Sequence, residues 1–258
     1  MLQVHSFVFS PFSENTYVVY DETNEAVIID PGCLMQAEKT ALSDFISSNN
    51  LTVKALLQTH AHLDHVFGSA FVKRKYGVKM HLHKNELPIL SEVENRCKIW
   101  GIPGYEPVEA DIMIDEGDVI SFGDSKLDVI FVPGHAPGHV AFVSHEDKMI
   151  FGGDVLFRNS IGRTDFPGCN YNDLINSIKT KFFTLPDDYT VYAGHNEPTT
   201  IGYCARHALS LIIIRNYACA FICICIRIRI RISIRIRICI CTKKIGRASC
   251  RERVLNLV

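Results

Sequence analysis

Residues 59–65 read THAHLDH and place three histidines and one aspartate directly after the apolar run VKALLQ. Three later apolar runs, DVIFVPG, MIFGG and TVYAG, also end at a histidine or an aspartate. Imidazole nitrogens and carboxylate oxygens bind zinc and similar divalent ions in proteins. The candidate ligands are His60, His62, Asp64, His65, His135, Asp154 and His195. Their types therefore predict metal-dependent chemistry.

The number and spacing of these residues favour two metal ions. Seven ligands exceed the four that one tetrahedral zinc ion requires. Two ions that share a bridging carboxylate would use all seven, and a tight turn can direct alternate side chains of His-X-His-X-Asp-His to neighbouring ions. A lone histidine at a strand end is more often a structural hydrogen-bonding residue. Seven such positions together make that interpretation the weaker one.

The elements that must position these ligands alternate between strands and helices. The runs LQVHSFVF, TYVVY and EAVIID are β-rich and are separated by turn signals. Helices are expected over residues 35–49, 66–76, 84–100 and 171–183, and later strands over 125–132, 139–145, 148–153 and 190–194. A loop rich in Gly, Pro and acids precedes the second strand group, and another long loop covers 155–170. This order predicts an α+β fold of two face-to-face sheets with helices outside.

Several motifs resemble those of a known family. HAHLDH, the later His, Asp and His, and the strand end IIDPG are similar to the metallo-β-lactamase superfamily. The segments PGHAPGHV, GGDVLFRNSIGRTDFPG and GHNEPTTIGY resemble, more narrowly, its short single-domain glyoxalase II-like hydrolases. The resemblance covers residues 1–203 and implies an αββα four-layer sandwich.

The resemblance also implies a role for each ligand. The first ion would be held by His60, His62 and His135. The second would be held by Asp64, His65 and His195. Asp154 would bridge the two ions, and Asp64 and Asp154 are the predicted catalytic carboxylates. The expected cofactor is two Zn²⁺, with Fe or Mn as alternatives, and the expected reaction is attack by a metal-bridging hydroxide on a small thioester such as S-lactoylglutathione.

Glutathione recognition is where the sequence departs from the larger glyoxalase II enzymes. Those enzymes have a C-terminal helical domain with basic residues, and a Lys and a Tyr in the loop after the bridging Asp. Arg163 and Asp165 occupy those two positions here, and Glu197 replaces a further Tyr. Arg163 is the predicted substrate-binding residue because a guanidinium binds carboxylates bidentately. An internal ion pair with Asp165 is the alternative, so the identity of the thiol stays open.

Two further residues are predicted to support the ligands. Asp30 ends the run AVIID and either orients a ligand histidine or forms the turn before Pro31. His139 shares the segment PGHAPGH with His135, but the motif gives it no metal. We therefore expect His139 to have a supporting or structural role.

Other functions remain alternatives. A mononuclear iron persulfide dioxygenase on the same fold needs only two histidines and one carboxylate, and the complete second ligand set disfavours it. A lactonase, a zinc β-lactamase or another hydrolase of the superfamily is a further alternative. A non-catalytic binding protein is disfavoured because no ligand is missing. The sequence has no P-loop, Rossmann glycine pattern or serine nucleophile elbow.

Composition limits the partners and the location. Residues 1–203 carry 27 acids against 15 lysines and arginines, which argues against a nucleic-acid partner. The expected partner is a small-molecule thioester, with no nucleic acid and no membrane, and the oligomeric state is open. Three cysteines in 1–203 and the absence of a recognisable signal peptide predict a cytoplasmic, disulfide-free protein.

Residues 204–258 differ sharply from this body, with 12 lysines and arginines and one acid. Residues 222–241 alternate Ile with Cys, Arg or Ser, as the codon ATA followed by TGT, CGT or AGT would produce. Residues 244–254, KIGRASCRERV, back-translate to a sequence that resembles a short-read library adapter. We therefore interpret 204–258 as an assembly artefact and expect a different C-terminus after Tyr203. An amphipathic strand, and a weak membrane span over 208–226, are the alternatives.

Overall fold

The computed structural model describes residues 1–207, 237–244 and 247–254, and the chain divides into two units, Met1–Arg206 and His207–Val258. In the second unit, β15 (Arg237–Lys244) and β16 (Arg247–Val254) pair as antiparallel strands. The membrane span considered over 208–226 lies outside the described residues, and the artefact interpretation of 204–258 stays a prediction. Within the described ranges, no helix is long and apolar enough to cross a membrane.

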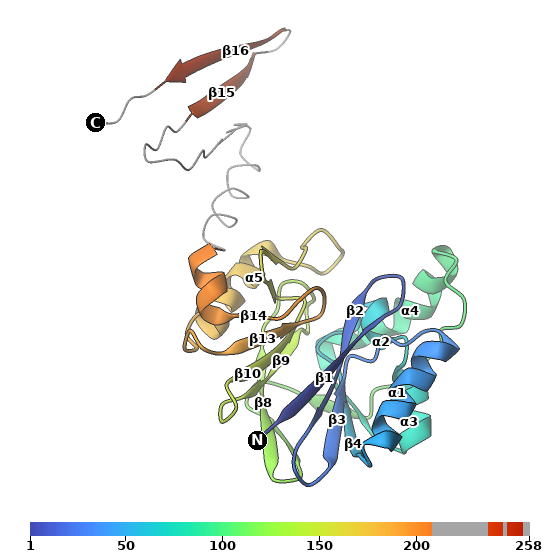
Figure 1. Ribbon diagram of the computed structural model, residues 1–258. Helices are drawn as coiled ribbons and strands as arrows, with labels where there is room; N and C mark the ends of the chain where they lie inside the picture. Colours follow the sequence, from blue (N-terminus) through green and yellow to red (C-terminus); the bar gives the residue numbers. More distant parts are fainter. Residues whose placement is uncertain (208–236, 245–246, 255–258) are drawn as a thin grey trace. The chain divides into compact units, whose positions relative to one another are not determined.

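Two six-stranded mixed sheets form the centre of the first unit (Figure 1). The first sheet, in the order β1-β2-β3-β4-β5-β6, contains Gln3–Phe9, Glu14–Tyr20, Glu25–Ile29, Thr52–Leu57, Met80–His83 and Ile112–Ile114. The second sheet, in the order β14-β13-β10-β9-β8-β7, contains Thr199–Thr200, Thr190–Ala193, Met149–Gly153, Val140–Ser144, Ser125–Phe131 and Val119–Phe122. A short hairpin joins β11 (Leu156–Phe157) to β12 (Ser160–Ile161).

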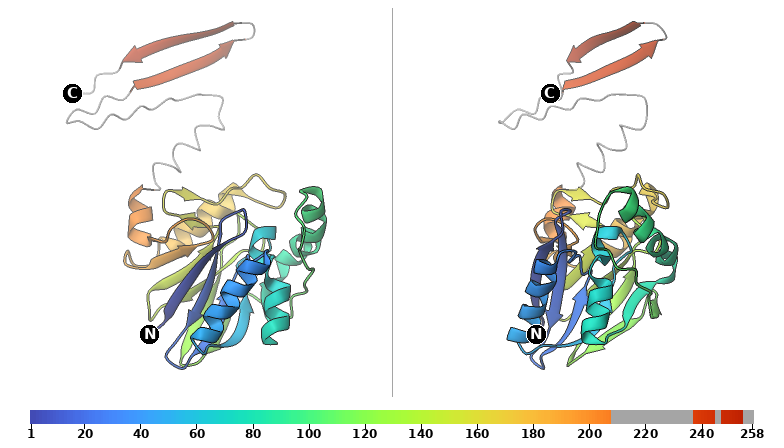
Figure 2. Two further views of the ribbon diagram at one scale, coloured as in Figure 1. Left: turned by 45° about the vertical axis from the view of Figure 1, so that its right-hand side comes forward. Right: turned by 90° about the vertical axis from the view of Figure 1, so that its right-hand side faces the viewer.

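Helices cover the outer faces of both sheets. Figures 1 and 2 show α1 and α3 along the first sheet, and Figure 1 shows α5 beside the second sheet. The helices are α1 (Gln36–Ser48), α2 (Leu63–Val66), α3 (Ser69–Tyr76), α4 (Leu87–Ile99) and α5 (Tyr171–Ser177), with η1 (Lys84–Glu86) before α4 and the π-helical η2 (Ile178–Phe182) after α5. Residues 201–207 are also helical. The predicted αββα four-layer sandwich is therefore confirmed.

Three layers of buried apolar side chains lie between the four layers of helices and sheets. Alternate residues of a strand point to opposite faces, so Val18 and Leu56 pack under the helices of the first sheet while Val19 and Leu57 face the second sheet. The third layer lies between the second sheet and the α5–η2 segment, where Phe182 is fully buried. Because both sheets are covered on both faces, candidate metal-binding side chains can reach solvent only at the ends of the strands.

Strand direction brings the ligand-bearing ends together. In the second sheet β9 is antiparallel to both β8 and β10, and β10 is parallel to β13, so β8, β10 and β13 all end at one edge. In the first sheet β3, β4 and β5 run parallel and likewise share an edge. The segments after these strands carry every candidate ligand.

Sequence patterns missed some local detail. The helix expected over 66–76 is broken, because Gly68 donates its N–H to the Pro31 carbonyl at 2.7 Å and leaves no room for a side chain beside Cys33. The acidic loop before the second strand group contains the short strands β6 and β7, and the loop expected over 155–170 contains the β11–β12 hairpin. All these strands have two to four residues, which is too short for a periodic signal.

Candidate metal centre

All seven candidate ligands gather where β4, β8, β10 and β13 end. Among the described residues, three groups of three have potential ligand atoms within 4.8 Å of one another. The first contains His60, His62 and His135, the second contains Asp64, His65 and His195, and the third contains Asp30, His60 and His65. The first two are the sets implied by the family resemblance.

Hydrogen bonds orient the histidines of the first set. His135 donates from Nδ1 to the Arg163 carbonyl at 2.9 Å, which turns Nε2 toward the centre. That Nε2 lies 2.8 Å from His62 Nδ1. His60 Nδ1 lies 3.0 Å from Thr59 Oγ1, so its Nε2 is also left for the centre. The three imidazoles are therefore arranged to share one ion.

The second set is oriented in the same way. His65 donates from Nδ1 to Asp30 at 3.1 Å, and His195 donates from Nδ1 to the Ser13 carbonyl at 3.1 Å. In both residues Nε2 faces the acidic ligands, and His195 Nε2 lies 3.3 Å from Asp64 Oδ2. Two fixed tautomers and one carboxylate thus form a site for a second ion.

Asp154 lies between the two sets. Its Oδ2 is 3.4 Å from His135 Nε2, in the first set, and 3.7 Å from His195 Nε2, in the second. Its Oδ1 is 3.7 Å from His65 Nε2. A Cβ added to Gly194 would lie 2.3 Å from Asp154 Oδ1, so glycine allows the chain after β13 to pass this close to Asp154. The geometry supports Asp154 as the bridging carboxylate.

Asp30 is tied to the ligand loop through three hydrogen bonds. It accepts from Thr59 N at 2.7 Å, from Thr59 Oγ1 at 2.5 Å and from His65 Nδ1 at 3.1 Å. It also has a positive φ of 47°, as a residue in a tight turn can. Asp30 therefore both forms the turn and orients His65, which supports the first of its two predicted roles without removing the second.

His139 contacts two of the candidate ligands, Asp154 and His60. Its Nε2 accepts the Asp154 backbone N–H at 3.2 Å, and its ring stacks on His60 with centroids 4.6 Å apart. The position fits the predicted supporting role, since His139 fixes the backbone of one ligand and the ring plane of another.

Burial and mutual charge give the two sets different protonation. Burial, reinforced by the neighbouring histidines, lowers the pKa of His60 well below its usual value and that of His62 to about 3. In contrast, the carboxylates of Asp154 and Asp64 raise the pKa of His65 against the effect of its burial. Despite full burial, His65 and His135 hold the pKa of Asp154 below its usual range. His60, His62 and Asp154 are therefore in the forms that bind metals, neutral imidazoles and an ionised carboxylate, whereas a metal ion at the second set would have to displace a proton from His65.

Unsatisfied atoms test whether metal ions fit. In the part of the chain that the structure describes, His60 Nε2, His65 Nε2 and Asp154 Oδ1 are buried and have no hydrogen-bond partner. Such an atom typically costs about 1–3 kcal/mol, and a coordinated cation would remove that cost. The mixed nitrogen and oxygen donors suit zinc, iron or manganese. The residues therefore fit a two-metal centre.

Arg163 lies beside the centre and is engaged within its own loop. Its Nε and Nη2 each donate to Asp165 at 2.8 Å, and its guanidinium lies 4.0 Å from the Phe166 ring centroid. Phe166 in turn contacts the His62 ring. The ion pair is the arrangement expected as the alternative to substrate binding, and it is exposed, so a substrate carboxylate could compete for it.

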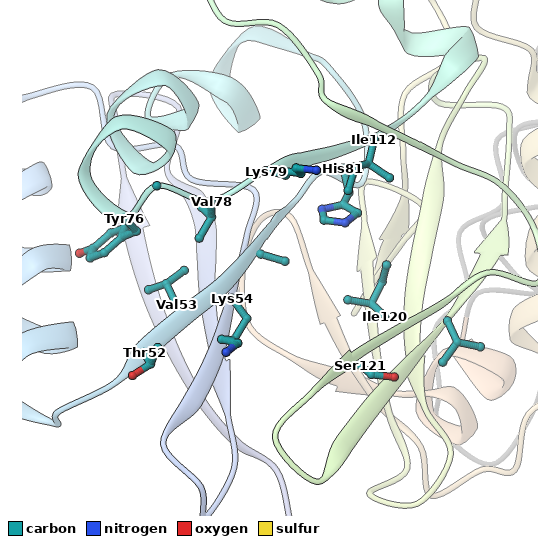
Figure 3. Close-up of a pocket in the computed structure, with 13 residues that line it drawn as sticks. Thr52, Val53, Lys54, Tyr76, Val78, Lys79, His81, Ile112, Ile120 and Ser121 are labelled. Atoms are coloured by element: carbon teal, nitrogen blue, oxygen red, sulfur yellow. The ribbon is translucent and has the colours of Figure 1, made fainter.

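A cavity of about 490 Å³ lies at the other end of β4, lined in part by Thr52, Lys54, His81 and Ser121 (Figure 3). None of the seven candidate ligands lines it. Lys54 there forms an ion pair with Glu25 at 2.9 Å. The cavity therefore offers no comparable set of catalytic groups.

Two buried carboxylates near the centre were not predicted. Glu14 is fully buried and accepts from Thr16 Oγ1 at 2.9 Å, and Glu86 is fully buried beside both ligand loops. Each lies at the boundary of a strand, Glu14 at the start of β2 and Glu86 three residues after β5. A position near the end of a strand was the signal in the sequence that could have indicated these two residues. Neither Glu14 nor Glu86 belongs to a metal-ligand motif.

Comparison with known proteins identifies relatives of this chain. Residues 10–195 match the family model of the metallo-beta-lactamase superfamily. A hydroxyacylglutathione hydrolase, GloC, from Haemophilus influenzae is 38% identical over 193 residues, covering 74% of this chain and 89% of the relative.

Solved structures show the same fold. A B3 metallo-beta-lactamase, BLEG-1, has a TM-score of 0.73 at 33% identity and covers 80% of this chain and 97% of its own. TTHA1623 in a di-iron-bound form has a TM-score of 0.70 at 34% identity, covering 79% and 98%. ETHE1 from Myxococcus xanthus has a TM-score of 0.65 at 27% identity, covering 80% and 82%.

Proposed function

Because the chain belongs to the metallo-beta-lactamase superfamily and is a metallo-hydrolase of that family, we propose that it hydrolyses small thioesters at a binuclear centre, as glyoxalase II does. The observation that carries the proposal is the position of Asp154, whose carboxylate faces both ligand sets. The similarity to a hydroxyacylglutathione hydrolase supports a thioester as the substrate. We propose zinc as the metal.

The residues of the centre have different roles in the proposed reaction. When bound, two divalent ions supply an activated water and polarise the acyl carbonyl. The neutral imidazoles of the first set bind without adding charge, while Asp64 and Asp154 offset the cations. Asp30 and the Arg163 and Ser13 carbonyls hold the histidine tautomers. A thiol has a pKa of about 8.5, so the leaving group of a thioester departs near neutral pH without a strong general acid.

Arg163 is the proposed contact for a substrate carboxylate. Its exposed pair with Asp165 is already bidentate, so an incoming carboxylate replaces one planar partner by another. We also propose a cytosolic location, supported by the free thiols of Cys33, Cys97, Cys169 and Cys204 in residues 1–207.

A single combined experiment tests the function. Metal content is measured on the purified protein, and turnover is measured with a glutathione thioester, a thioester without glutathione, a lactone, a β-lactam and a persulfide. Two metal ions per chain with thioester hydrolysis as the fastest reaction is the expected result. Preference for the lactone or the β-lactam would reject the thioester as substrate while leaving the binuclear centre.

The iron persulfide dioxygenase stays as the second candidate. The similarity to ETHE1 is compatible with it, and TTHA1623 shows that a protein of this fold binds iron. One iron per chain and oxygen consumption with the persulfide would favour this candidate. The complete second set of Asp64, His65 and His195 favours the hydrolase.

A further inference from the structure

Glu86 is a buried carboxylate to which no role has so far been given. It is fully buried at the end of η1, directly before α4. Among the described residues, no lysine, arginine or histidine forms an ion pair with it, and burial raises its pKa to about 7. A buried carboxylate without a cation is costly, so its retention calls for a specific compensating interaction.

That interaction involves the two loops of the three-histidine set. Glu86 Oε2 accepts the backbone N–H of Ala61 at 2.8 Å, and Oε1 accepts that of Gly138 at 2.6 Å. Ala61 lies between His60 and His62, and Gly138 lies three residues after His135. One side chain therefore connects the two loops that carry the ligands of the first ion.

The two loops come from different sheets. The Ala61 loop follows β4 in the first sheet, and the Gly138 loop follows β8 in the second. Gly138 also packs tightly here, since an added Cβ would lie 2.9 Å from Glu86 Cγ and 2.8 Å from His83 Nδ1. Glu86 therefore contacts both loops, and it packs closely against Gly138 in the second of them.

We propose that Glu86 is a positioning residue whose carboxylate holds these two loops at the spacing that lets His60, His62 and His135 bind one metal ion. The inference rests on the metal centre of the proposed function, but not on its substrate. Residues that orient ligands from outside the coordination sphere typically contribute 10–100-fold in metal affinity.

Glu86→Gln and Glu86→Ala test the proposal, with Val93→Ala as the matched control. Val93 is a fully buried apolar residue of α4 that makes no side-chain hydrogen bond, so its truncation destabilises the same helix without removing a hydrogen bond to either loop. Zn²⁺ affinity is measured by chelator competition on substrate-free protein. His195→Ala identifies which of the two binding constants belongs to the second set.

The expected result is a loss of about 10–100-fold in the affinity of the three-histidine set for both Glu86 variants. The Gln variant must lose affinity because its amide NH₂ replaces one acceptor and faces a backbone N–H. Val93→Ala should keep the wild-type affinity despite a lower Tm. Wild-type affinity in Glu86→Gln would show that the side chain only fills space. An equal loss in Val93→Ala would show that Glu86 acts through general stability. Either outcome overturns the proposal.

Discussion

Asp154→Asn is the substitution that most directly tests the binuclear centre. The change keeps the shape of the side chain but removes the negative charge between the two ligand sets. Asp154 lies 3.4 Å from His135 Nε2 and 3.7 Å from both His65 Nε2 and His195 Nε2, so its carboxylate is placed to neutralise both ions. The amide nitrogen of Asn cannot bind a cation, which leaves one oxygen for one ion.

The expected loss of kcat/KM is large because Asp154 would bind the metal ions directly. Outer residues that only orient ligands contribute 10–100-fold, so a shared ligand should cost at least about 100-fold in kcat/KM, or about 2.7 kcal/mol. The bound metal should fall from two ions toward one. The fold should persist, because it is the Asp154 backbone N–H, not the carboxylate, that bonds His139.

The assay is thioester hydrolysis measured together with metal content and the circular dichroism spectrum. Asp188→Asn is the matched control, because it removes a carboxylate that pairs with Lys148 on the surface. Near-normal turnover by a fully metallated Asp154→Asn protein would refute the bridging assignment. Lost turnover with lost secondary structure would make Asp154 a folding residue instead.

Four other predictions use the same assays. Asp30→Asn removes a charged acceptor of His65, so the second Zn²⁺ should bind about 10–100-fold more weakly, and unchanged affinity in chelator competition would limit Asp30 to the turn. Gly194→Ala puts a Cβ 2.3 Å from Asp154 Oδ1 and should lower kcat by about 100-fold; normal kinetics would show that the segment after β13 can shift. Arg163→Ala should raise KM for glutathione thioesters more than it lowers kcat, whereas an equal effect on thioesters without a carboxylate would confine Arg163 to the loop. Chelation should lower Tm by roughly 8–16 °C for metal at about 1,000 times its Kd, and an unchanged Tm would argue against tight binding in the native state.

The fold and the ligand cluster were predictable because strong local signals agreed. Apolar runs with period two predicted the strands, and each ligand followed such a run directly. Asp30 was predicted on the same basis, since it directly follows β3, which pairs with β4. A residue at the end of a buried strand has its position fixed by the core, so its neighbours in space can be inferred from strand order.

Other features depend on contacts that have no local pattern. Whether Arg163 binds substrate or forms an internal ion pair depends on the conformation of its loop. That conformation places Asp165 Oδ1 2.8 Å from Arg163 Nε. Glu86 acts on loops that are 25 and 52 residues away in sequence. Neither spacing is periodic, so only the folded chain shows which groups meet.

The metal centre also links the two sheets of the first unit. Each three-ligand set takes two residues from the segment after β4, which includes α2, and one that follows a strand of the second sheet, His135 after β8 or His195 after β13. Apart from the apolar layer between the sheets, bound metal would therefore be a second connection between the halves, and Glu86 a third. A change that shifts one sheet against the other must then alter both ligand sets together. Residues that belong to neither ligand set but lie within that apolar layer, such as Phe151, should influence metal affinity through the same movement.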